Sequence, residues 1–163
     1  MVSLIKRVLP SEIINAHHIG STAVPSLAAK PVIDILLEVK NVINLDQYDY
    51  DKDMTKIGYI PKGEFGIPGR RFYVKGEIDR THHIHAFNEN SYEVKRHLAF
   101  RDYLIANPKI ADEYGSLKKQ IAQKCNDDID KYCDLKSDFV KYHEQKAIKW
   151  RDDNRTRELE RNK

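Results

Sequence analysis

Three short segments in the first half of the chain alternate between apolar and polar residues, and this pattern constrains the fold more than any other feature. They are residues 31–39, 70–75 and 81–87. Successive side chains of a strand point to opposite faces, so Ile33 belongs to an apolar face and Asp34 to the other. Each segment is therefore predicted to be a strand with one apolar face and one face that carries reactive groups.

If these strands belong to one sheet, their polar faces form the floor of a pocket and helices cover the apolar side. The side chains expected on this floor are Asp34, Arg71, Lys75, His83 and His85. The last two strands flank residues 76–79, Gly-Glu-Ile-Asp, and this spacing predicts a hairpin.

The remaining patterns are helical. Residues 46–57 predict a helix that Gly58 closes, and residues 91–163 predict helices throughout, with starts at Tyr92, at Pro108 and near Ile129. A chain of 163 residues fits one domain, here with a mixed α/β part over residues 1–90 and a helical part over residues 91–163. The predicted fold class is α+β: a short mixed sheet with helices on one face and a C-terminal helical portion.

Composition excludes several classes of protein. No apolar run reaches the roughly 18 residues of a membrane span, and the first residues lack the pattern of a secretory signal, so we expect a cytoplasmic protein without membrane attachment. The net charge of +3 is too small to indicate nucleic-acid binding, whereas a small anionic ligand fits it. Cys125 and Cys133 match neither a disulfide framework nor a zinc module.

Residues 18–34 carry the densest motif. Gly20 permits close approach of the backbone, and Ser21 and Thr22 add hydroxyls and amides to a turn that can cradle a phosphate. Neither a Walker loop nor a Gly-x-Gly-x-x-Gly motif is present, and a plain strand-to-helix turn capped by Ser21 is the alternative interpretation. Four charged side chains can bind phosphates: Lys30, Arg70, Arg71 and Lys75.

The run His-Ile-Gly-Ser-Thr-Ala-Val-Pro-x-Leu-Ala-Ala-Lys-Pro-x-Ile-Asp, residues 18–34, resembles the signature of the GrpB family. The resemblance continues through His83-Ile-His85 and residues 100–104, Phe-Arg-Asp-Tyr-Leu, and covers roughly residues 16–150. That family is similar to the polymerase-β-type nucleotidyltransferases, which implies a nucleotidyltransferase-like fold. In some bacteria a similar domain is fused to dephospho-CoA kinase.

The superfamily resemblance implies two carboxylates, two residues apart, that hold a divalent metal. Asp34, thirteen residues after Ser21, matches the second carboxylate, whereas Val32 occupies the position of the first. His83 and His85 can replace the missing ligand, because imidazoles bind transition metals readily. The alternative is a histidine pair that is hydrogen-bonded in a partly buried pocket.

Two functions are therefore expected. The first is transfer of a nucleotidyl or phosphoryl group to a small molecule, with a divalent metal (Mg, Mn or Zn). Its expected site has phosphate ligands at Gly20, Ser21, Thr22 and Lys30, metal ligands at Asp34, His83 and His85, and catalytic roles for Asp34, His85, Arg71 and Lys75. The alternative is a non-catalytic domain that binds a nucleotide or another phosphorylated metabolite, with dephospho-CoA kinase as the candidate partner of the domain. The absent first carboxylate favours it.

Overall fold

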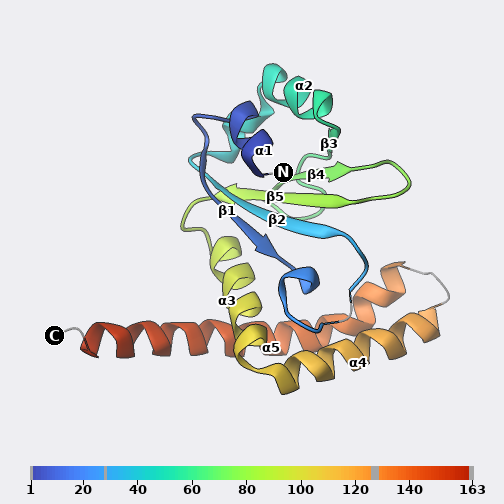
Figure 1. Cartoon of the computed structure of the whole chain (residues 1–163), viewed down its shortest axis with the longest axis vertical. Helices are drawn as coiled ribbons and strands as arrows, with labels where there is room; N and C mark the ends of the chain where they lie inside the picture. The colour runs from blue at the N-terminus through green and yellow to red at the C-terminus, as the bar shows by residue number, and fades with distance from the viewer. Residues whose placement is uncertain (1, 28, 126–128, 162–163) are drawn as a thin grey trace. The chain divides into compact units, whose positions relative to one another are not determined.

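The computed structural model describes residues 2–27, 29–125 and 129–161 (Figure 1). The elements follow in the order α1 (Val2–Val8), β1 (Ile13–Ile19), the 3₁₀ turn η1 (Ser21–Ala23), β2 (Ile33–Val39), the 3₁₀ turn η2 (Val42–Asp46), α2 (Tyr48–Lys56), β3 (Tyr59–Pro61), β4 (Arg71–Lys75), β5 (His82–Asn88), α3 (Tyr92–Ala106), α4 (Pro108–Cys125) and α5 (Ile129–Arg161). The predicted α+β class is confirmed.

The chain forms two compact units. The first consists of Met1–Ala23 and Lys30–Lys95, and the second of Val24–Ala29 and Arg96–Lys163. All five strands lie in the first unit, whereas the second is built from helices. No helix in the described part of the chain is long and apolar enough to cross a bilayer.

The five strands form one mixed sheet with the order β1-β2-β5-β4-β3. The central pair, β2 and β5, is parallel, and every other neighbouring pair is antiparallel. The three predicted strands correspond to β2, β4 and β5, with ends that shift by two residues at most, and the predicted hairpin is β4–β5. The sequence did not predict β1 and β3, the two edge strands.

Helices α1 and α2 cover the apolar face of the sheet, as the sequence predicted. Ile5 of α1 and Met54 of α2 are fully buried in one cluster with Ile35, Leu37 and Ile84 of the sheet. Helix α2 ends where the amide of Gly58 donates to the carbonyl of Thr55, and Gly58 adopts the left-handed conformation (φ +86°) typical of a helix C-terminus.

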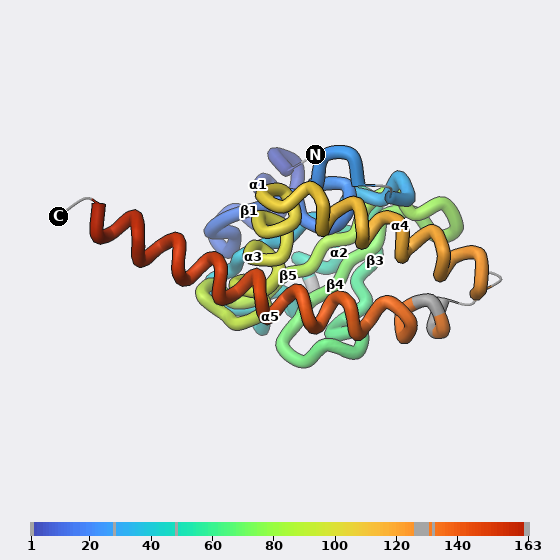
Figure 2. Tube along the Cα trace, turned by 90° about the horizontal axis from the view of Figure 1, so that it is seen from below, coloured from blue at the N-terminus to red at the C-terminus, as the bar shows by residue number. Residues whose placement is uncertain are grey.

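The second unit has its own core. Helices α4 and α5 form a hairpin and lie side by side in both views (Figures 1 and 2). Val24 and Leu27 pack against Leu104 and Tyr114 of the helices, and Ala99 and Ala147 belong to a second buried cluster. An ion pair of 2.7 Å joins Arg96 to Glu144 within this unit.

Candidate metal and phosphate site

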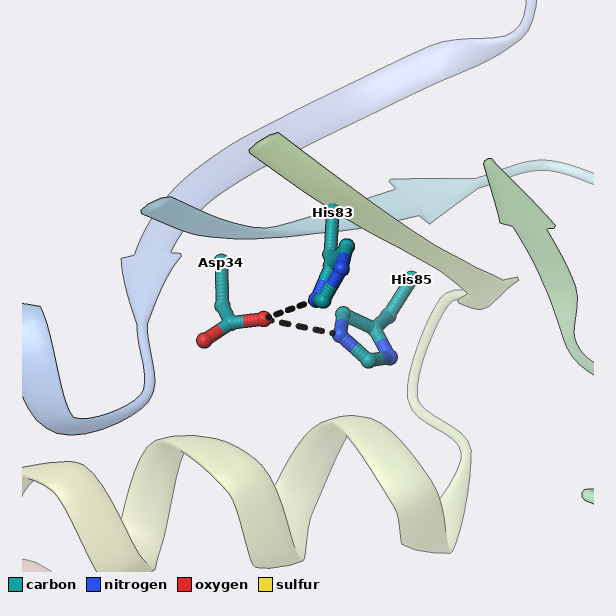
Figure 3. A group of neighbouring side chains, drawn as sticks. All are labelled: Asp34, His83 and His85. Carbon is teal, nitrogen blue, oxygen red and sulfur yellow. Dashed lines mark hydrogen bonds and ion pairs between the residues drawn. The ribbon is translucent and has the colours of Figure 1, made fainter. Parts of the chain in front are cut away.

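The sheet brings together three of the residues that the sequence singled out. Asp34 on β2 lies directly opposite His83 on β5, and His85 follows two residues later on the same face. Asp34 Oδ1 lies 3.2 Å from His83 Nδ1 and 3.3 Å from His85 Nε2 (Figure 3). One oxygen of the carboxylate therefore contacts both imidazoles.

Burial and hydrogen bonding together determine the charges of this group. The side chains of Asp34, His83 and His85 are 27%, 23% and 15% exposed. Burial by itself would raise the pKa of Asp34, but hydrogen bonds and charge from His83 and His85 outweigh it and lower that pKa to about 2. Burial lowers the pKa of His85 below its usual 6.5, in spite of its bond to Asp34. At neutral pH the group thus contains an ionised carboxylate beside an uncharged His85.

Gly20 lies against the Asp34 carboxylate. Its φ of +72° is one that side chains rarely adopt, and a Cβ built on it would lie 2.5 Å from Asp34 Oδ2. The close approach expected at Gly20 is therefore made by the aspartate of the site. With Oδ2 held beside Gly20, Oδ1 faces the two histidines.

The turn after Gly20 leads from β1 into η1, a single 3₁₀ turn that the amide of Ala23 closes by donating to the Gly20 carbonyl. Gly20 is exposed, and Ser21 and Thr22 are half-buried. Thr22 Oγ1 lies 2.9 Å from His18 Nε2. Lys30 is exposed in the segment before β2. A phosphate role for these four residues stays a prediction.

The sequence prediction for Arg71 and Lys75 was wrong about the face of the sheet. In the antiparallel β4–β5 pair, Phe72 lies opposite His85 and Val74 lies opposite His83. Directly opposed residues share a face, so the polar members of β4 lie on the other side, away from Asp34.

Those two side chains have other partners. Arg71 donates from Nε to Asp46 Oδ1 at 2.5 Å and from Nη2 to Asp46 Oδ2 at 2.7 Å. The Lys75 ammonium lies 5.2 Å from the centre of the Tyr59 ring. Arg71 and Lys75 are thus not part of the group around Asp34.

The structure places the positively charged side chain of Arg70 beside His85. The residue is only 6% exposed, its guanidinium carbon lies 4.5 Å from the centre of the Phe72 ring, and Nη1 lies 3.3 Å from His85 Nδ1. The sequence offered Arg70 as a phosphate ligand by charge alone. Its contact with His85 could not be predicted, because Arg70 precedes β4 in a loop and strand alternation says nothing about a loop residue.

The donor set fits a metal ion. The three ligand atoms lie within 4.8 Å of one another. Neighbouring ligands of a tetrahedral ion with bonds of about 2.0–2.1 Å are about 3.3 Å apart, and Asp34 Oδ1 lies 3.2 and 3.3 Å from the two imidazole nitrogens. Two imidazoles and one carboxylate are a set that zinc, iron and manganese accept. The two carboxylates of the β4–β5 turn, Glu77 and Asp79, are exposed.

The second nitrogen of each imidazole, which would not contact the metal, lacks the hydrogen-bond acceptor that usually supports a metal ligand. A histidine that ligates a metal usually donates its other N–H to an acceptor. In the part of the chain that the structure describes, His83 Nε2 is buried without a hydrogen-bond partner, and His85 Nδ1 faces the donor Arg70.

Comparison with known proteins agrees with the signature in residues 18–34. The chain matches the family described as GrpB protein over residues 1–146. It belongs to the GrpB family, so the resemblance is confirmed.

Individual relatives support this family assignment. The chain is 47% identical over 147 residues to the UPF0157 protein YqkA of Bacillus subtilis (strain 168), a match that covers 90% of this chain but 42% of that protein. The crystal structure of the conserved protein GrpB from Enterococcus faecalis superposes with a TM-score of 0.84 at 47% identity, over 91% of this chain and 88% of that one. The dephospho-CoA kinase of Mycolicibacterium paratuberculosis is 24% identical over 175 residues, which cover 93% of this chain and 43% of the kinase.

Proposed function

We propose that this protein binds a phosphorylated donor together with a divalent cation and transfers the nucleotidyl or phosphoryl group of the donor to a small molecule. The observation that carries the proposal is the group formed by Asp34, His83 and His85, whose ligand atoms lie within 4.8 Å of one another on two neighbouring strands. The reaction class comes from the resemblance of the GrpB signature to the nucleotidyltransferases. In that class an acceptor oxygen attacks phosphorus and the leaving oxygen departs with the bonding electrons.

Each part of the site has a role in this proposal. Asp34, His83 and His85 would hold the cation, which supplies charge stabilisation at the phosphate oxygens. Gly20, Ser21, Thr22 and Lys30 would bind phosphate. Arg70 takes the place that the sequence gave to Arg71 and Lys75, because its guanidinium lies on the His85 side of the sheet.

A second candidate is a domain that binds a phosphorylated ligand without catalysis. It is favoured by the single carboxylate of the group, since Val32 stands where nucleotidyltransferases have their first metal ligand. The match to a protein named dephospho-CoA kinase covers 43% of that protein, which is consistent with a domain that accompanies a separate kinase domain. Dephospho-CoA is therefore a second probe to test beside ATP.

Cation binding is the first test. Mn²⁺ is titrated into the full chain and free Mn²⁺ is followed by electron paramagnetic resonance, with Asp34→Asn as the test variant. Asp79→Asn is the matched control, because it removes the same charge from an exposed turn that follows β4. We expect Asp34→Asn to weaken Mn²⁺ binding at least about tenfold and the control to stay within about twofold of the wild type.

Ligand binding then separates the two candidates. The melting temperature is measured with ATP or dephospho-CoA, each with and without Mn²⁺. A rise that requires both Mn²⁺ and Asp34 supports the transferase. A rise with the phosphorylated ligand alone, unchanged in Asp34→Asn, supports the binding domain and contradicts the metal-dependent function.

A further inference from the structure

The contact between Arg70 and His85 bears on how a cation can enter the site. A guanidinium can donate hydrogen bonds but cannot accept them. His85 Nδ1, 3.3 Å from Arg70 Nη1, must therefore be the acceptor, and in an uncharged imidazole the proton then resides on Nε2. Nε2 is the atom 3.3 Å from Asp34 Oδ1, so it donates to the carboxylate.

This proton arrangement opposes metal binding. To ligate a cation, His85 Nε2 must offer a lone pair, and the proton of the neutral ring then moves to Nδ1. Nδ1–H and Arg70 Nη1–H would be two donors facing each other at 3.3 Å. The bond from Arg70 must break before His85 can act as a neutral ligand.

The charge of the site also opposes cation binding. The group around Asp34 has one carboxylate, and the buried guanidinium of Arg70 already lies beside it. A divalent cation would leave the site with an excess of positive charge. An anion that binds with the cation reduces this excess, and its oxygens are stronger acceptors for a guanidinium than a neutral imidazole.

Backbone carbonyls hold the other two nitrogens of the guanidinium, so the contact with His85 can change while these bonds remain. Arg70 Nε donates to the Glu64 carbonyl at 3.1 Å, and Nη2 donates to the Phe65 carbonyl at 2.6 Å. The guanidinium carbon also lies over the Phe72 ring. Nη1 can thus exchange His85 for an anionic oxygen while Arg70 keeps its place.

We propose that Arg70 weakens cation binding at Asp34, His83 and His85 until a phosphate-bearing ligand binds, whose oxygen accepts the Nη1–H and releases His85 for the cation. This inference rests on the proposed function and adds to it that metal and phosphate bind cooperatively. By linkage, each must raise the affinity for the other by the same factor.

The test uses inorganic phosphate as the anion. Mn²⁺ is titrated into the full chain with and without phosphate, and free Mn²⁺ is corrected for its complexes with phosphate. In the wild type we expect phosphate to raise the Mn²⁺ affinity about fivefold or more, and Mn²⁺ to raise the phosphate affinity equally, a range typical of coupled sites.

Arg70→Gln removes the obligate donor and leaves an amide oxygen that can accept from His85 Nδ1–H. We expect this variant to bind Mn²⁺ about fivefold or more tightly without phosphate, and the effect of phosphate to fall below about twofold. Arg71→Gln, the same substitution on the opposite face, should keep the wild-type coupling.

The outcomes separate the two proposals. Asp34-dependent Mn²⁺ binding that phosphate does not change in the wild type leaves the proposed function standing and overturns the role of Arg70, whether or not Arg70→Gln folds. Unchanged or weaker Mn²⁺ binding by a folded Arg70→Gln variant overturns it as well. Failure of wild type and variant to bind Mn²⁺ under any condition overturns both.

Discussion

The Asp34 carboxylate lies so close to the Gly20 backbone that a Cβ at residue 20 would be 2.5 Å from Asp34 Oδ2 and 3.1 Å from Asp34 Cβ. Asp34 is paired in the sheet with Ile19, the residue before Gly20. Two features therefore require glycine at this position: the φ of +72°, and the Asp34 carboxylate, which occupies the space that a Cβ would need. The conformation of the turn and the direction of the carboxylate depend on each other.

Gly20→Ala should therefore damage both stability and the site. We expect the free energy of unfolding to fall by about 1–3 kcal/mol, the usual range for a side chain forced into the left-handed region. Mn²⁺ affinity should fall at least about tenfold, because the carboxylate must turn away from His83 and His85. Urea denaturation at pH 7 and the Mn²⁺ titration measure the two effects.

Gly66→Ala is the matched control. Gly66 has a similar φ of +82°, but nothing lies within 4 Å of a Cβ built on it. It should lose comparable stability and retain Mn²⁺ binding. Equal loss of Mn²⁺ binding in both variants would show that backbone strain alone, not contact with Asp34, disturbs the site.

Asp34→Asn separates a ligand from a structural carboxylate. The amide oxygen of asparagine can still accept from the two imidazoles, so we expect the free energy of unfolding without metal to fall by only about 1–2 kcal/mol. Mn²⁺ should raise the melting temperature of the wild type and leave that of the variant unchanged. A loss of about 3–5 kcal/mol without any Mn²⁺ effect on the wild type would identify Asp34 as one partner of a buried structural pair.

Strand alternation was sufficient to predict the centre of the site. Asp34, His83 and His85 occupy alternate positions of β2 and β5, and the parallel register of these strands brings them onto one face. Ile35, Leu37 and Val39 of β2 are buried in one cluster with residues of α1 and α2. Sequence could predict this much because the two faces of β2 and β5 differ in polarity at these positions.

The same reasoning failed for β4, because both of its faces are buried. Phe72 is 5% exposed on the face of the histidines, and Tyr73 is 1% exposed on the opposite face. The polarity of β4 therefore does not indicate which of its faces lies on the same side of the sheet as His83 and His85. The pairing of Phe72 with His85 determines this.

Two strands were absent from the prediction for a different reason. The sequence of β1, Ile-Ile-Asn-Ala-His-His-Ile, does not alternate, and most of its residues are half-buried or exposed, as suits an edge strand. Strand β3 has three residues and ends at Pro61. Both are held by pairing with a neighbour, which local pattern does not reveal.

Arg71→Gln tests the corrected face directly. The variant should bind Mn²⁺ and phosphate within about twofold of the wild type, since Arg71 lies on the opposite face from His83 and His85. Because Asp46, its ion-pair partner, is half-exposed, we expect a loss of stability of about 1 kcal/mol or less. Binding measured on the folded variant checks the first expectation, and a loss of about tenfold would restore Arg71 to the site.

The second unit contains a histidine whose burial predicts sensitivity to acid. His143 is 7% exposed, and its ring centre lies 4.2 Å from that of Phe139. Its Nδ1 is buried without a hydrogen-bond partner in the part of the chain that the structure describes. Burial lowers the pKa of His143 below its usual 6.5, and the nearby Lys146 lowers it further while Glu113 opposes the change.

The free energy of unfolding should therefore decrease as the pH falls below about 6.5, because the unfolded chain takes up a proton at His143 before the folded chain does. Above this pH the residue is neutral in both states and contributes nothing. One such group changes the free energy by up to about 1.4 kcal/mol per pH unit. Urea denaturation of wild type and His143→Gln between pH 7 and 5 should give a smaller slope for the variant, with a remainder from His82 and His85, whose pKa values are also lowered. Identical slopes would mean that His143 is protonated as easily in the folded protein as in the unfolded chain.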